Sequence, residues 1–100
     1  MHTKDIQITC NIHCEGLQGE VYRLFLDNDL ITERGWRWDP KTHYLQENVA
    51  LRLLPGDHIL SIAGVDSPTS FMLSDLKIER GAAKADFNAN KTTEITLRVN

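Results

Sequence analysis

Apolar and polar side chains alternate along most of this chain, and short turn-forming sequences separate the alternating runs. In residues 5–13 every second side chain is apolar: Ile6, Ile8, Cys10 and Ile12. Successive side chains of a strand point to opposite faces, so such a run buries one face and exposes the other. Residues 93–100 repeat the pattern, and we expect this last strand to be an integral part of the fold. The alternation predicts an all-β protein.

Turn sequences divide the rest of the chain. The Asp27-Asn28-Asp29 turn predicts a hairpin between residues 20–27 and 30–38, because short Asx side chains tolerate left-handed geometry. Apolar side chains on both faces of residues 20–27 predict a central strand. The Pro55-Gly56-Asp57 turn predicts that residues 58–65 return as the hairpin partner of the preceding segment. Residues 71–80 form a further predicted strand with a bulge near Ser74-Asp75, and residues 84–87 form a short one.

Residues 43–54 fit two interpretations. Leu45, Val49 and Leu53 lie four positions apart, as on one side of a helix, and good helix formers surround them. As a strand, the same segment has one apolar face that only Glu47 interrupts. We favour the strand, because the turn that follows is typical of a β context.

The size and the pattern together predict the architecture. A chain of 100 residues, 41% of them apolar, has room for one core and therefore for a single domain over residues 1–100. About eight strands joined by short connections leave no room for crossover helices. We therefore predict an antiparallel β-sandwich of jelly-roll type.

The charge balance argues against several partners. There are 11 basic and 14 acidic residues, a net charge of -3, and the basic residues are spread singly. Nucleic-acid binders cluster Lys and Arg to neutralise phosphates, so we expect no nucleic-acid partner. No apolar segment is long enough to serve as an export signal or a membrane span. The expectation is synthesis in the cytoplasm and no membrane partner.

Cofactor and catalytic signals are weak. Cys10 and Cys14 lie roughly 13 Å apart along an extended strand, whereas a disulfide needs Cα atoms within about 7 Å, so we expect free thiols. These cysteines with His13 supply only part of a zinc ligand set, and residues 27–29 are better explained as a turn than as a calcium loop. We predict no metal and no cofactor. Because the motifs of common hydrolases and nucleotide-binding enzymes are absent, we expect a protein that is not an enzyme.

Three aromatic residues are the candidate binding site. Trp36 and Trp38 lie two positions apart, so on a strand they project from one face, and Tyr44 follows across a short loop. Rings arranged in this way can stack on sugars or anchor a protein partner. The alternative is that the tryptophans fill the core of the sandwich.

Two families resemble parts of this chain. The run Tyr22–Arg34, with Trp36-Arg37-Trp38 and residues 44–48, resembles small β-sandwich virion accessory proteins of marine cyanobacterial tailed phages. The same hairpin, together with residues 71–78, resembles the jelly-roll layout of some carbohydrate-binding modules.

The first resemblance implies a non-catalytic virion structural protein, made in the host cytoplasm. It would be a capsid decoration or fibre-associated subunit whose partners are other virion proteins or further copies of itself. The second implies a carbohydrate-binding module that uses Trp36, Trp38 and Tyr44 on a glycan. A phage-encoded regulator that binds a host protein is a further alternative.

Overall fold

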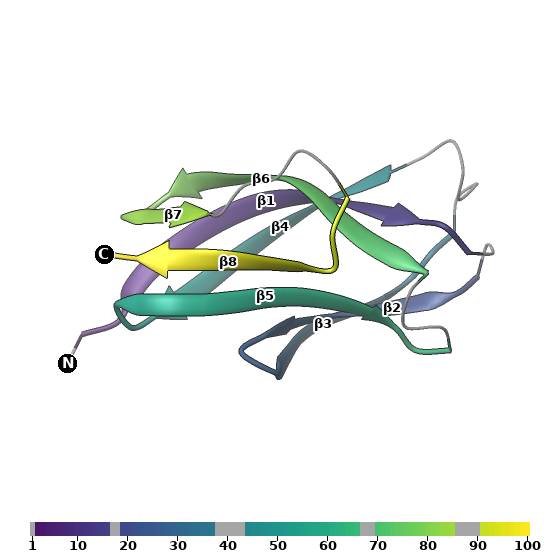
Figure 1. Cartoon of the computed structure of the whole chain (residues 1–100), viewed down its shortest axis with the longest axis horizontal. Helices are drawn as coiled ribbons and strands as arrows, with labels where there is room; N and C mark the ends of the chain where they lie inside the picture. The colour runs from purple at the N-terminus through teal and green to yellow at the C-terminus, as the bar shows by residue number, and fades with distance from the viewer. Residues whose placement is uncertain (1, 17–18, 38–43, 67–69, 86–90) are drawn as a thin grey trace.

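The computed structural model describes residues 2–16, 19–37, 44–66, 70–85 and 91–100. Its strands run along the long axis of a molecule that measures 43 × 23 × 17 Å, and the two ends of the chain lie at the same end of it (Figure 1). The strands are β1 (Lys4–Cys14), β2 (Val21–Leu26), β3 (Asp29–Gly35), β4 (Tyr44–Leu53), β5 (Gly56–Gly64), β6 (Phe71–Arg80), β7 (Ala83–Ala85) and β8 (Glu94–Val99).

These strands form two antiparallel sheets. Sheet A has the strand order β4-β1-β6, and sheet B has the order β3-β2-β5-β8-β7. The predicted all-β antiparallel sandwich of about eight strands is therefore confirmed. The prediction did not specify the strand order. In the structure the sheets hold three and five strands, and β1 lies between β4 and β6.

The alternation in β1, the central strand of sheet A, decides which of its side chains face the core. Its apolar side chains face the core and are at most 2% exposed: Ile6, Ile8, Cys10, Ile12 and Cys14. Facing them from sheet B are the inward side chains of β8, which include Ile95, Leu97 and Val99. Since β8 lies between β5 and β7, the prediction of an integral last strand is confirmed.

The first hairpin also follows the prediction. β2 pairs with β3 through a turn in which Asp27 and Asn28 have positive φ values of 51° and 72°. Such left-handed geometry is more accessible to Asp and Asn than to most residues. On its other edge β2 pairs with β5, which confirms it as a central strand of sheet B. Its outer face is only partly covered, since Val21 and Phe25 are half-buried and Arg23 is exposed.

The ambiguous segment is a strand, but its predicted partner is wrong. β4 pairs with β1, from Lys4↔Leu53 to His13↔Tyr44, whereas β5 pairs with β2 and β8 in the other sheet. The Pro55-Gly56 turn therefore passes the chain between layers. A turn sequence specifies that the chain reverses, and the partner of each strand is decided by long-range packing.

The predicted bulge is present in β6. Asp75 has φ 51°, and the register between β1 and β6 shifts in the interval between Thr9 and Asn11. The extra residue places Ser74 and Asp75 together toward the outer side of sheet A, beside β1. The short strand predicted at residues 84–87 begins as β7, and its last two positions lie outside the described residues.

Candidate binding face

The outward side of sheet A carries polar side chains on all three of its strands. On β1 these are Gln7, Thr9, Asn11 and His13. On β4 they are Tyr44, Gln46, Asn48 and Arg52, with the small apolar Ala50 between Asn48 and Arg52. On β6 they are Ser74, Asp75, Lys77, Glu79 and Arg80. We call this surface the outer polar face.

Strand register sets the side chains of β1 and β4 opposite one another. Asn11 lies opposite Gln46 and Thr9 lies opposite Asn48, so amide groups form the middle of the face, while the buried Thr9 hydroxyl donates to Glu79. The outward side chains of β4 are exposed. An amide group donates and accepts hydrogen bonds at the same time, as a sugar hydroxyl does. The middle of the face is therefore suited to a ligand with many hydroxyl groups.

A polar network joins β1 to the bulge of β6. His13 Nε2 lies 2.6 Å from Ser74 Oγ, and Ser74 Oγ donates to Asp75 Oδ2 at 3.3 Å. Asn11 Nδ2 donates to the same carboxylate oxygen at 3.3 Å. Because the hydroxyl proton of Ser74 is directed at Asp75, its oxygen accepts the proton on His13 Nε2.

The surroundings of His13 favour its neutral form. Burial lowers the pKa of His13, and the neighbouring Lys91 ammonium lowers it further. A neutral imidazole carries one proton, on either of its two ring nitrogens. Ser74 is 2% exposed, so a substrate has little access to its oxygen. The contacts of His13, Ser74, Asp75 and Asn11 join the outer side of β1 to the bulge of β6.

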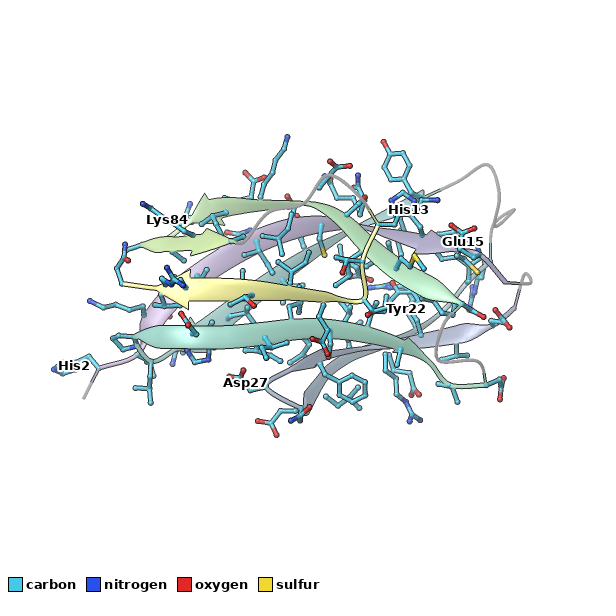
Figure 2. All side chains as sticks on the ribbon, in the orientation of Figure 1. His2, His13, Glu15, Tyr22, Asp27 and Lys84 are labelled. Carbon is cyan, nitrogen blue, oxygen red and sulfur yellow. The ribbon has the colours of Figure 1, made fainter. Side chains whose placement is uncertain are left out.

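An aromatic ring and a hollow lie toward opposite ends of the outer polar face. Tyr44 is 62% exposed, and its ring centroid is 6.0 Å from that of His13. Figure 2 shows His13 and Glu15 toward one end of the molecule and Lys84 toward the other. The hollow, of about 460 Å³, adjoins Gln7, Ala50, Arg52 and Arg80, at the end where β1 begins.

The predicted aromatic site is only partly present on this surface. Trp36 is fully buried, and its ring packs edge-on to Phe71 with centroids 6.2 Å apart. Hydrogen bonds from Trp36 N to Glu20 O and from Gly19 N to Trp36 O hold it there, after the end of β3. The prediction that Trp36 belongs to a binding platform is therefore wrong. Trp38 lies outside the described residues, and Tyr44 is exposed.

Sequence reasoning missed a second polar cluster, which lies inside the sandwich. Glu47 of β4 points inward, where its Oε1 accepts hydrogen bonds from Tyr22 Oη at 2.5 Å and from Arg34 Nε at 2.7 Å. Tyr22, labelled in Figure 2, and Arg34 belong to sheet B, so their hydrogen bonds to Glu47 tie the two sheets together. The sequence signal was the interruption of an apolar face by Glu47.

This cluster perturbs the groups that form it. Burial raises the pKa of Tyr22, and the hydrogen bond to Glu47 raises it further. The hydrogen bond to Glu47 also raises the pKa of Arg34. Burial, together with the charge of Glu47, raises the pKa of the Cys10 thiol to about 12. Cys10 and Cys14 are buried free thiols, as their spacing predicts.

In the part of the chain that the structure describes, no three His, Cys, Asp or Glu side chains converge as metal ligands. The described residues contain no helix with the length and apolarity that crossing a membrane requires. Comparison of the chain with protein-family models, with curated proteins and with solved structures found no match.

Proposed function

We propose that this protein is a non-catalytic binding subunit of a tailed-phage virion, a capsid decoration or fibre-associated protein. The observation that carries the binding role is the outer polar face, an accessible sheet surface whose amide and guanidinium groups stand on paired strands. Because the paired strands hold the backbone in place, little backbone ordering is needed when a partner binds, which favours affinity. The resemblance of residues 22–48 to cyanophage virion proteins supplies the virion setting.

The polar groups of this face support binding better than catalysis. Ser74, the obvious nucleophile beside a histidine, is buried and hydrogen-bonded to Asp75. The Ser74 hydroxyl donates to Asp75, so its proton is not directed at His13. A nucleophile needs both access and an available base, and the described residues of this network supply neither.

Mass spectrometry of purified particles tests the virion role. A structural subunit is expected at a constant number of copies per particle, and it should remain after washing at high salt and gradient sedimentation. A major capsid protein from the same particles serves as the reference for copy number. Absence of the chain from washed particles, while it is present in the lysate, would refute the virion role.

A second candidate function is carbohydrate binding by the same face. The observation that favours it is Tyr44, an exposed ring beside His13 at the end of a row of amide side chains. Aromatic rings provide a large contact area to sugar rings, and amides provide directional hydrogen bonds to hydroxyls. Of the three aromatic residues predicted from sequence, Tyr44 carries this candidate, because Trp36 is buried.

Binding to a glycan panel with matched variants tests the second candidate. Tyr44→Ala is expected to weaken binding, because it removes the ring that stacks on the sugar. Ile59→Ala is the control, since Ile59 is exposed at 45% on sheet B, away from the outer polar face. Equal loss in the two variants, or no loss in Tyr44→Ala, would refute binding at this surface.

A further inference from the structure

The hollow beside Gln7 and Arg80 has a different chemistry from the amide groups in the middle of the outer polar face. Its polar lining is Asp5, Gln7, Arg52 and Arg80, so two guanidinium groups stand against one carboxylate. The chain as a whole has a net charge of -3. The lining of the hollow therefore carries a net positive charge, although the protein as a whole is acidic.

The two arginines are differently engaged. Arg52 Nε lies 3.2 Å from Asp5 Oδ1, and the two side chains are each 81% exposed. An ion pair so open to solvent contributes little and is readily exchanged for another anion. Arg80 lies opposite Gln7 at the end of β6, is exposed, and forms no ion pair among the described residues. Guanidinium groups recognise carboxylate and sulfate oxygens through pairs of parallel hydrogen bonds.

The space between these groups exists because residue 50 is alanine. Ala50 lies opposite Gln7 on the neighbouring strand, and its methyl group leaves the backbone of β1 and β4 accessible. From Ala50 to Tyr44 the strand covers six residues, roughly 20 Å at about 3.3 Å per residue. A linear ligand of that length would contact the hollow, the amide groups and Tyr44 together.

We propose that the outer polar face binds an acidic oligosaccharide, whose carboxylate or sulfate group occupies the hollow between Arg52 and Arg80. The proposal rests on carbohydrate binding by this face. Charge complementarity selects the ligand, since the hollow offers Arg80 and the solvent-exposed, exchangeable ion pair of Arg52, and the adjoining strands offer amide groups that match hydroxyls. Glu79, the nearest other carboxylate on β6, accepts a hydrogen bond from Thr9 Oγ1 at 3.0 Å.

Binding to three linear polysaccharides tests the proposal: a neutral glucan, a polyuronate and a sulfated galactan. The acidic polymers are expected to bind at least tenfold more tightly than the glucan, about the effect of one charge-assisted hydrogen bond. Comparison of the polyuronate with the galactan tells which acidic group the hollow prefers. Raising the salt concentration should weaken binding of both acidic polymers and leave the glucan unchanged.

Three variants distinguish binding at the hollow from non-specific attraction of acidic polymers to positive charge. Arg80→Gln removes the unpaired guanidinium, and Ala50→Phe fills the hollow without changing any charge. Each is expected to weaken binding of the acidic polymers by roughly tenfold or more. Lys84→Gln is the matched control, because it removes one positive charge from β7 of sheet B at the same end of the molecule. Circular dichroism verifies that each variant is folded.

The outcomes separate the proposal from the function on which it rests. Equal affinity for all three polymers, with Arg80→Gln unchanged, would overturn the acidic ligand and leave carbohydrate binding in place. The same loss in Lys84→Gln as in Arg80→Gln would overturn the hollow as a site. No binding to any polymer would overturn carbohydrate binding itself.

Discussion

Tyr22→Phe removes a single hydroxyl group from the interior of the sandwich. Tyr22 is fully buried, and its Oη donates a 2.5 Å hydrogen bond to Glu47, which is itself 5% exposed. The phenylalanine ring keeps the aromatic contact with Phe71, whose centroid lies 5.2 Å away. The substitution therefore tests one hydrogen bond to a buried side chain and changes the packing little.

The size of the stability loss depends on Glu47, which stays buried without the hydrogen bond from Tyr22. Loss of a hydrogen bond to a charged group costs about 1.5–3 kcal/mol, and more when the group stays buried. Glu47 keeps its hydrogen bond from Arg34, whose side chain is 50% exposed, so solvent screens that interaction. We expect the free energy of unfolding to fall by about 2 kcal/mol, or about 8–16 °C in Tm for a domain of this size.

Urea and thermal unfolding, followed by circular dichroism and tryptophan fluorescence, measure this change. Tyr44→Phe removes the same hydroxyl from an exposed tyrosine, and we expect it to change stability by less than about 0.5 kcal/mol. A double-mutant cycle of Tyr22→Phe with Glu47→Leu isolates the contact, because neither replacement can form the hydrogen bond, with an expected coupling of about 1–2 kcal/mol. Equal effects of Tyr22→Phe and Tyr44→Phe, or additive effects in the cycle, would refute the reasoning.

Three further predictions concern the rest of the fold. His58 Nδ1 lies 2.5 Å from Asp27 Oδ2 and Nε2 lies 2.7 Å from Leu54 O; these hydrogen bonds raise the pKa of His58 above 6.5. The difference in Tm between the wild-type protein and His58→Gln should be largest below pH 6.5 and should decline as the pH rises through the folded-state pKa of His58. A difference in Tm that does not change with pH would contradict this. Burial raises the pKa of both cysteine thiols. A thiol reagent should therefore react with almost no thiol in the folded protein and with two thiols after denaturation. If no thiol reacts after denaturation without reductant, the two cysteines are not free thiols. Deletion of residues 93–100 removes three buried aliphatic side chains and should abolish folding. Their burial contributes roughly 5–9 kcal/mol, compared with a total free energy of unfolding of about 5–15 kcal/mol for a typical domain. A truncated protein that keeps β-type circular dichroism would contradict this prediction.

Local features of the fold were predictable because they depend on neighbouring residues. The period of two in residues 5–13 and 93–100 assigns each side chain to one face of a strand, whatever the strand pairs with. Asp27-Asn28 predicted a turn with left-handed residues, and the change of face near Ser74-Asp75 predicted the bulge. Each of these signals lies within a few residues of the feature that it predicts.

The candidate site was harder to predict, because its parts come from distant strands. His13 contacts Ser74, which is 61 positions away, and Thr9 contacts Glu79, which is 70 positions away. Alternation marked these residues as polar positions of their own strands. It did not indicate that β1 would lie between β4 and β6, which is what brings them onto one face.

Residue patterns alone establish that this chain forms strands, where most of them turn, and which side chains share a face. The folded structure was needed to show that β4 and β5 belong to different sheets, that Trp36 fills the core, and that Glu47 links the layers. The two kinds of feature differ in the range of the interactions that produce them. Alternation reflects the geometry of one strand, whereas pairing depends on how whole faces pack and on the hydrogen-bond partners that each buried polar group finds across the sandwich.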